Sequence, residues 1–315
     1  MPVDPVLALF GDRLFMAAVG VYVLAMALHA AEAAARTRRP EAAAVTVPAR
    51  AASGGAGPEA PPDGPGRRTR AHRLGRMGVS LTVLAVLLHL GSIVARGLAV
   101  DRWPLGNMYE FTSAICLAAV GGWLVVLRRQ PGLRPAAPFV LLPVVVLMFL
   151  AGTVLYAQAA PVVPALQSYW LVVHVTTISL SSGLLLVPGV ASLLYLLRSS
   201  GRGGALGARL PGAEALDRLA YRTTIVAFPL YTFGVVVGAI WAEAAWGRFW
   251  GWDPKETVAF VAWVIYAAYL HARSTAGWRT GRAAWINIAG FAVVLFNLFF
   301  INMVVAGLHS YAGVG

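Results

Sequence analysis

Long runs of apolar residues dominate this sequence, and each is bounded by charged or turn-forming residues. A run of about 20 apolar residues spans the hydrocarbon core of a bilayer as an α-helix. We therefore predict an all-α, polytopic membrane protein with about eight transmembrane helices. Their approximate positions are 14–35, 78–97, 108–127, 136–156, 170–197, 223–242, 255–273 and 284–307.

The distribution of basic residues orients these helices. If the N-terminus lies outside, the inner segments hold 20 of the 25 lysines and arginines, and the outer segments hold five. Cytoplasmic loops of membrane proteins carry such an excess. We therefore predict that both termini face outward. This bias also accounts for the formal net charge of +12, so we expect no nucleic-acid partner.

Composition agrees with a membrane protein. Of the 315 residues, 59% are hydrophobic and 12% are charged, whereas about a quarter are charged in soluble domains. The single cysteine, Cys116, excludes an internal disulfide, a Cys-x-x-Cys pair and covalent c-type haem attachment to this chain. The first apolar run is long enough to span, so we expect no cleavable signal peptide.

Three regions follow from this pattern. Residues 1–36 are expected to form an N-terminal transmembrane helix. Residues 37–77 are expected to be a disordered, basic cytoplasmic linker, because its Ala, Pro, Gly and Arg residues cannot build a core. Residues 78–315 are expected to form a seven-helix membrane domain. Within it, residues 211–222 are expected to form a short interfacial helix.

The most distinctive stretch is the outer loop at residues 242–257. From residue 246 it reads Trp-Gly-Arg-Phe-Trp-Gly-Trp-Asp-Pro-Lys-Glu-Thr. Asp253, the following proline and the glutamate at the third helical position predict a helix start with a capping box. The rings, with Arg248 and Lys255, favour a platform for a flat, apolar ligand that carries acidic groups. Anchoring at the membrane interface and simple capping are the alternatives.

Two further local patterns concern the outer face. Trp246 and Trp250 would share a face if the loop between them were helical. In the outer loop before the third helix, Asn107 is suited to be an N-cap, with Glu110 at the third helical position. Here too, capping and interface anchoring are the simpler explanation.

The positions of the histidines suggest iron ligands. His174 lies about one turn inside the outer end of the fifth helix, and His309 lies at the outer end of the eighth. Both are level with the aromatic loop, so we expect haem with two axial imidazoles. His271 lies roughly 25 Å deeper and is either structural or part of an inner site. His29 and His89 lie in apolar runs, where core packing is the simplest explanation.

The aromatic loop resembles the tryptophan-rich "WWD" signature of proteins that handle haem in c-type cytochrome maturation. It is most similar to the CcsA branch (also called CcsB or ResC) of System II, because residues 254–257 read Pro-Lys-Glu-Thr. The related CcmC and CcmF proteins share the Trp-Asp core but differ after it. Supporting matches lie at 106–110, 167–174 and 307–311, and the likeness covers about residues 78–313.

The resemblance implies a function, partners and a site. Haem b would cross the plasma (inner) membrane to an extracytoplasmic site beneath the WWD loop, with iron held by histidines that match His174 and His309. It would then be attached to the Cys-x-x-Cys-His motif of an apocytochrome c, as in a cytochrome c haem lyase. A ResB-like membrane subunit, a thiol-reducing protein and membrane lipid are the other implied partners.

An earlier, inner haem site is also implied, with His271 as one iron ligand. The second ligand would come from the partner subunit, from His89 or from His29. The full set of implied haem-binding residues is His174, His309, His271, Trp246, Trp250, Trp252, Arg248, Asp253, Lys255, Asn107 and Tyr109. Two alternatives stay open: a haem exporter without lyase activity, and a b-type haem quinol oxidoreductase.

Overall fold

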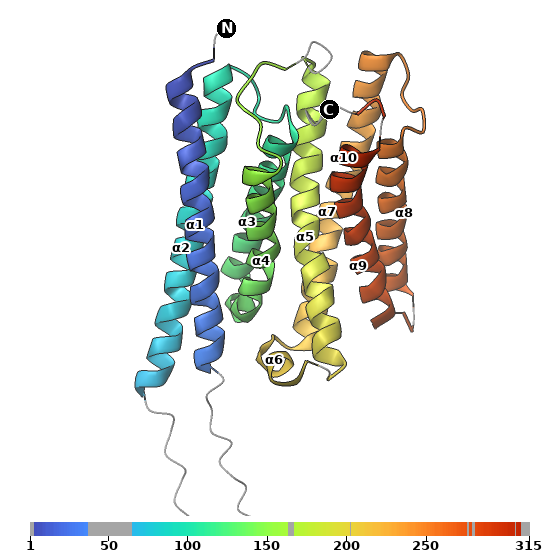
Figure 1. Cartoon of the computed structure of the whole chain (residues 1–315). Coiled ribbons are helices and arrows are strands. Elements are labelled where there is room, and N and C mark those ends of the chain that lie inside the picture. Colours follow the sequence, from blue (N-terminus) through green and yellow to red (C-terminus); the bar gives the residue numbers. More distant parts are fainter. Residues whose placement is uncertain are drawn as a thin grey trace, which may run out of the picture.

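The fold is a bundle of long helices (Figure 1). The computed structural model describes residues 3–36, 65–162, 167–201, 203–275, 277–278, 281–305 and 307–309, and these contain no strand, as predicted. The long helices are α1 (Pro5–Arg36), α2 (Pro65–Val100), α3 (Met108–Arg129), α4 (Ala137–Thr153), α5 (Tyr169–Ser199), α7 (Ala213–Trp246), α8 (Pro254–Ser274) and α9 (Gly281–Phe296). The short ones are η1 (Pro131–Ala136), α6 (Gly204–Arg209), the π-helical η3 (Asn297–Ile301) and α10 (Asn302–Val304).

Seven helical stretches in the described part of the chain are long and apolar enough to cross a membrane. Helix α8 corresponds to the seventh predicted span and is not among them, although its 21 residues would extend about 30 Å. Its ends are polar, with Lys255 and Glu256 in the first turn and His271 and Arg273 in the last. The chain is therefore an all-α, multi-pass membrane protein whose α8 is less apolar than its neighbours.

Two helices begin earlier than predicted. Helix α2 starts at Pro65 and includes residues 65–77, which were expected to belong to the linker. Helix α7 starts at Ala213 and absorbs most of the predicted interfacial helix. The first extension contains five arginines, and residues 213–222 contain three alanines, two leucines and two arginines; these residue types favour helix whether or not they lie in the membrane. The remainder of the predicted linker, residues 37–64, lies outside the described residues.

The N-terminal helix is part of the same bundle as the rest. Helices α1 and α2 pack along each other, with Ala18, Ala25 and Ala85 fully buried between them. Helix α1 also packs against α4. Helix α5 lies in the middle of the bundle, between α1–α4 on one side and α7–α9 on the other (Figure 1).

The predicted outer loops lie at one end of the bundle, and α6 lies at the other (Figure 1). Hydrogen bonds connect these loops to one another and to nearby helices. Arg102 Nε donates to Ala160 O at 2.9 Å, and Trp103 Nε1 donates to Thr176 Oγ1 at 2.9 Å. The aromatic loop is therefore placed among the other loops that the charge pattern assigns to one face.

The close approach of α3 and α5 generates a stability prediction. A Cβ added at Gly183 would lie 2.3 Å from Ile115 O and 2.7 Å from Ala118 Cβ. Gly183→Ala should therefore destabilise the protein by about 1–3 kcal/mol, since the helices must separate. Gly121→Ala is the control, because nothing lies within 4 Å of that position. Thermal unfolding in detergent compares them, and equal melting temperatures would contradict the prediction.

Candidate functional site

The aromatic loop is shaped by the two helix ends that flank it. Helix α7 ends at Trp246 because Gly247 adopts a left-handed conformation, with φ of 70°. Helix α8 starts at Pro254 with Asp253 as N-cap and a complete capping box, which confirms the sequence prediction. The loop is therefore a short turn between two long helices.

Trp252 has an unusual backbone conformation. Its φ of 57° is positive, which is a strained geometry for a bulky residue. The flanking N–H groups of Gly251 and Asp253 both donate to Glu256 Oε2, at 2.9 and 3.1 Å. Thr257 Oγ1 donates to Trp252 O at 3.2 Å. Hydrogen bonds from the first turn of α8 therefore hold the strained residue in place.

Asp253 contacts a histidine in addition to capping α8. Its Oδ1 accepts the N–H of Leu308 at 2.8 Å, and its Oδ2 lies 2.8 Å from His309 Nδ1. Since an ionised carboxylate only accepts, Nδ1 of His309 must carry the proton. The lone pair of a neutral ring is then on Nε2, which is the arrangement found in carboxylate–histidine–metal sites. Asp253 thus both caps α8 and orients His309.

His174 is held in an equivalent way by a carbonyl group. Its Nδ1 donates to the carbonyl oxygen of Gly234 in α7 at 2.8 Å, which again leaves the lone pair on Nε2. The ring fits against α7 because residue 238 is glycine: a Cβ there would lie 2.6 Å from the ring carbon Cε1. Both histidines therefore have a fixed tautomer and orientation.

Trp241 connects the two histidines. Its ring centroid lies 6.1 Å from that of His174, in a stacked arrangement, and 5.8 Å from that of His309. Trp246 lies 4.8 Å from Trp241 and 4.9 Å from His309. Trp241 was not among the predicted site residues, because a single tryptophan in an apolar run is typical of a helix core.

His174 and His309 line a cavity of about 90 Å³ between α3, α5, α7, α8 and the end of α9. Pockets for small ligands are typically lined mostly by apolar residues, with a small number of polar groups. The walls here are mostly apolar. Besides the histidines, the polar lining residues are Ser182, Tyr231, Lys255, Glu256, Asn297 and Asn302.

The two predicted cations have different positions. Lys255, the only lysine in the chain, lines the cavity, donates to Asn302 Oδ1 at 2.5 Å and lies 5.9 Å from the Phe111 ring. Arg248 instead pairs with Glu256 at 3.3 Å and lies 5.8 Å from the Trp246 ring. Lys255 is therefore the better placed of the two to bind an anionic group inside the cavity.

The tryptophans of the loop divide into two groups. Trp246 faces the histidines, whereas Trp250 and Trp252 contact each other at 5.8 Å and each lies 6.3 Å from Phe260 of α8. Trp246 and Trp250 therefore do not form one face, because the helix ends between them. Trp250 lines the cavity, and Trp252 is 66% exposed.

Burial is the main reason that His309 is neutral. Burial lowers the pKa of His309, Lys255 lowers it further, and the hydrogen bond to Asp253 only partly offsets these effects. Burial raises the pKa of Asp253, but the hydrogen bonds from Leu308 and His309 outweigh burial and bring it below its usual value. The pair therefore consists of an ionised carboxylate and a neutral imidazole.

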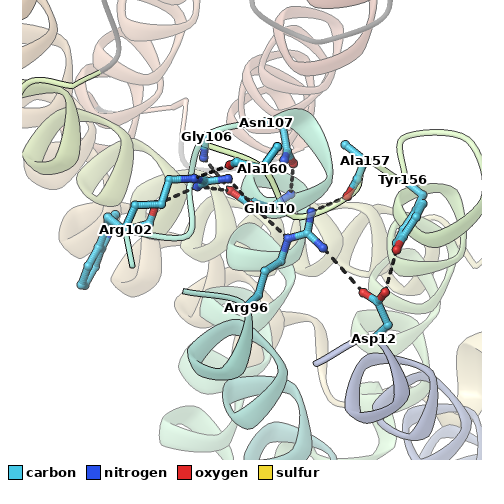
Figure 2. A network of polar contacts seen from close by, with 10 residues as sticks. Asp12, Arg96, Arg102, Gly106, Asn107, Glu110, Tyr156, Ala157 and Ala160 are labelled. Carbon is cyan, nitrogen blue, oxygen red and sulfur yellow. Dashed lines mark hydrogen bonds and ion pairs between the residues drawn. The ribbon is translucent and has the colours of Figure 1, made fainter. Parts of the chain in front are cut away.

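The second outer loop is built around Glu110 (Figure 2). Asn107 caps α3 by accepting the N–H of Glu110 at 2.9 Å, as predicted. The Glu110 side chain does not bond back to Asn107. It accepts from Gly106 N at 2.7 Å, Arg96 Nε at 2.7 Å and Arg102 Nη1 at 2.8 Å. The buried carboxylate of Glu110 thus binds two arginines and the backbone of the second outer loop.

This cluster also connects α1 and the third outer loop (Figure 2). Arg96 donates to Ala157 O and lies 3.6 Å from Asp12, which accepts from Tyr156 at 2.6 Å. Tyr109 lies beneath Arg96, 4.7 Å from its guanidinium carbon, and is 5.0 Å from Phe15 of α1. Tyr109 therefore packs against α1 and α2 and does not line the histidine cavity.

The remaining histidines lie apart from this cavity. His271 is on the exposed face of α8, near the opposite end of the bundle. His89 is fully buried and uses both nitrogens, with Ser113 Oγ at 2.8 Å and Tyr22 Oη at 3.4 Å. His29 is also fully buried, against Gly78 of α2. Since α1 and α2 lie across α5 from α8 (Figure 1), neither histidine faces His271.

Together these features define a multi-pass membrane protein with two oriented histidines beneath a tryptophan-rich loop. The profile of the cytochrome C assembly protein family matches residues 105–309, and the chain belongs to that family as a CcsA-type cytochrome c biogenesis protein.

Several curated relatives carry the description "Cytochrome c biogenesis protein CcsA". The protein from Synechococcus sp. (strain RCC307) is 38% identical over 259 residues, which cover 73% of this chain and 83% of the relative. Those from Parasynechococcus marenigrum (strain WH8102) and Prochlorococcus marinus (strain MIT 9303) are each 37% identical, over 259 and 272 residues, and 85% of each relative is covered. The chain accordingly has a role in cytochrome c biogenesis.

The Glu110 cluster predicts a large loss of stability when its carboxylate is removed. Glu110→Gln leaves Arg96 and Arg102 without their buried counter-charge, which should cost about 3–5 kcal/mol. The control is Glu214→Gln, which breaks the exposed pair with Arg218 and should cost at most about 1 kcal/mol. Thermal unfolding of both variants in detergent tests this, and a Glu110 variant as stable as the control would refute it.

Proposed function

We propose that this protein binds haem b in the cavity beneath the aromatic loop and delivers it to apocytochrome c for covalent attachment. The observation that carries the proposal is the arrangement of His174 and His309. Each ring donates from Nδ1 to a protein acceptor, each packs against Trp241, and both line one cavity. Two neutral imidazoles prepared in this way are suited to axial ligation of haem iron.

The lining of the cavity suits haem. Its mostly apolar walls match a flat, mostly apolar ligand. Lys255 supplies a cation for a propionate. Asn297 lines the cavity and Trp241 lies beside the two histidines; the buried Oδ1 of Asn297 and Nε1 of Trp241 have no hydrogen-bond partner among the described residues. Such atoms are uncommon in native structures, and polar groups of a ligand or bound water would satisfy them.

In this proposal the chain contributes binding and orientation. Asp253 and the Gly234 carbonyl orient the two imidazoles, Trp246 covers His309, and Lys255 binds a haem carboxylate. In the attachment step, the sulfur of each apocytochrome cysteine bonds to a haem vinyl carbon, and the thiol hydrogen adds to the neighbouring carbon. That addition consumes no oxidant, so fixing haem and peptide in register is the main requirement.

Partners complete the proposal. A thiol-reducing protein keeps the Cys-x-x-Cys-His cysteines free, and a ResB-like membrane subunit shares the lyase activity. His271 belongs to an inner haem site, and its outward position favours a second ligand from that subunit over His29 or His89. The excess of basic residues on the other side of the bundle supports an aromatic loop on the extracytoplasmic face, and the membrane in this proposal is the plasma membrane.

Replacement of the cavity histidines provides the direct test. His174→Ala and His309→Ala should each lose haem from the purified protein and abolish holocytochrome c formation, because one axial ligand is missing. The matched control is His72→Ala, which removes an exposed histidine of α2 and should behave as wild type. Haem is measured by optical spectra and holocytochrome by covalent haem staining.

The same assay separates the competing functions. Undiminished holocytochrome c in His174→Ala would refute the proposal. Haem bound to the wild-type protein, without a thioether product in the presence of partner and apocytochrome, would indicate an exporter. A reversible, quinol-linked haem titration would indicate a quinol oxidoreductase.

The carboxylate that orients His309 generates a second prediction. Asp253→Asn should weaken haem binding by roughly 10–100-fold, the usual cost of losing such a partner. Melting temperature should change little, because Asn caps a helix as well as Asp does. Asp253→Ala is the comparison, since it should lose haem binding and about 0.5–2 kcal/mol of stability.

The pH dependence of haem binding by Asp253→Asn shows why its affinity is lower. Asp253 raises the pKa of His309 against the larger lowering by burial and Lys255, so its removal moves the pKa further down and the ring stays neutral. The affinity of Asp253→Asn should therefore remain low as pH rises from 7 to 9. Recovery at high pH would show that the carboxylate acts by controlling protonation and not by orienting the ring.

A further inference from the structure

A groove lies on the outer face of the bundle, between the second outer loop, the third outer loop and the start of α5. Its volume is about 360 Å³, and pockets for ligands typically measure about 300–1,000 Å³. Its lining combines apolar side chains of α5 with polar side chains of the loops, which are Leu171, Val172 and Val175, and Asp101, Gln167 and Ser168. We name it the outer groove.

The outer groove is continuous with the space beside the two cavity histidines. A cleft of about 110 Å³ reaches both histidines, and four residues line this cleft as well as the groove: Leu105, Gly106, Leu171 and Val175. The aromatic loop connects α7 and α8, whereas the groove belongs to the loops next to α2, α3 and α5. The loop and the groove therefore reach the histidines from different helices.

The two loops that form the groove are fixed relative to each other. Glu110 accepts from Gly106 N and from Arg102, and Arg102 Nε donates to Ala160 O of the third loop at 2.9 Å (Figure 2). The loops also touch at Gly106, where an added Cβ would lie 2.4 Å from Val162 Cγ1. Because a preformed site loses little conformational entropy on binding, this rigidity favours a ligand-binding role.

The groove has hydrogen-bonding capacity that the described residues leave unused. Ser168 is the N-cap of α5, but its side chain makes no capping bond, so N–H groups in the first turn of α5 can donate to carbonyl oxygens of a ligand. Asp101 is exposed, and its carboxylate has no ion pair among the described residues. Arg102 is instead bound to Glu110 at 2.8 Å. The groove therefore offers backbone donors and one unpaired negative charge.

These charges favour a cationic peptide over an anionic lipid head group. By the predicted orientation, the outer segments hold seven of the 13 acidic residues and five of the 25 basic ones. A lipid phosphate in the groove would face the carboxylate of Asp101, and the guanidinium of Arg102 is already paired. An extended peptide suits the groove better, because its carbonyl groups can bind the start of α5 and a basic side chain can pair with Asp101.

We propose that the outer groove binds the segment of apocytochrome c that carries the Cys-x-x-Cys-His motif, with basic side chains beside the motif. This rests on the proposed function of the cavity of His174 and His309, and it identifies the surface that holds the peptide substrate. The groove directs the motif through the cleft toward that cavity, while the aromatic loop covers the histidines from α7 and α8. Asp101 and Val172 act as positioning residues for the peptide and take no part in bond formation.

The test measures peptide binding separately from haem binding. Full-length protein loaded with haem in detergent is titrated, under reducing conditions, with a fluorescent peptide that carries Cys-Ala-Ala-Cys-His between pairs of lysines. Val172→Trp should weaken peptide binding at least about tenfold, because the larger ring occupies the groove. The haem spectrum should not change, since Val172 lines the groove but not the histidine cleft. Val172→Phe is a smaller change if the tryptophan variant melts early.

The role of charge is tested at Asp101. Its φ is 48°, and asparagine tolerates positive φ as aspartate does, so Asp101→Asn removes the charge and keeps the backbone. Wild type should prefer the lysine-flanked peptide to one flanked by glutamates. Asp101→Asn should reduce this preference about two- to fivefold, the usual range for an exposed ion pair.

Matched controls accompany both variants. Glu243→Gln removes another exposed acid of the outer face, near the end of α7, and should keep the wild-type preference between the two peptides. Val236→Trp enlarges an exposed valine on α7 and should bind the peptide with wild-type affinity.

Each outcome has a distinct meaning. Wild-type peptide affinity in Val172→Trp, or an undiminished charge preference in Asp101→Asn, would overturn the groove assignment and leave the cavity function intact. Displacement of the peptide by phosphatidylglycerol would also overturn it and indicate a lipid site. Peptide binding by a wild-type protein that takes up no haem would refute the proposed function of the cavity, while the groove would stand as a peptide site.

Discussion

The carboxylate of Asp253 is the interaction on which the outer site depends. One side chain begins α8, accepts the N–H of Leu308 and orients His309. The start of a helix, the segment after α10 and a candidate iron ligand are therefore held by one charge. Because the carboxylate is mostly buried, it is stable only while these donors surround it, and any displacement of α8 would also displace His309.

A second buried carboxylate organises the neighbouring loops in the same way. Glu110 binds Arg96, Arg102 and the backbone of Gly106, and Arg96 extends the contacts to α1 and to the third outer loop. The residues just before α3 line the space beside the two histidines. The polar loops at this end of the bundle are thus fixed by two ionised carboxylates, Asp253 and Glu110. Each carboxylate accepts several hydrogen bonds, which offset the free-energy cost of burying its charge.

Local patterns predicted the helices, both N-caps and the pairing of His174 with His309, because each depends on nearby residues or on depth in the membrane. The site predictions that were wrong or missing depend on how the helices rotate and pack against one another. Apolar periodicity could not show that Tyr109 faces α1 or that Trp241 lies between the histidines, since both are settled by contacts from distant helices. The early starts of α2 and α7 were not predicted, because hydropathy indicates which residues span the membrane and not where a helix begins.

Helix α8 combines an apolar middle with polar residues at both ends. Charged residues near the ends of a spanning helix reduce its tendency to insert, yet α8 keeps Lys255 and Glu256 at one end and His271 and Arg273 at the other. Most of these are offset by partners: Lys255 by Asn302, Glu256 by the loop backbone and Arg273 by Asp217. His271 is exposed on the surface of the bundle, so it is the one of these four residues that faces outward without a partner among these pairs.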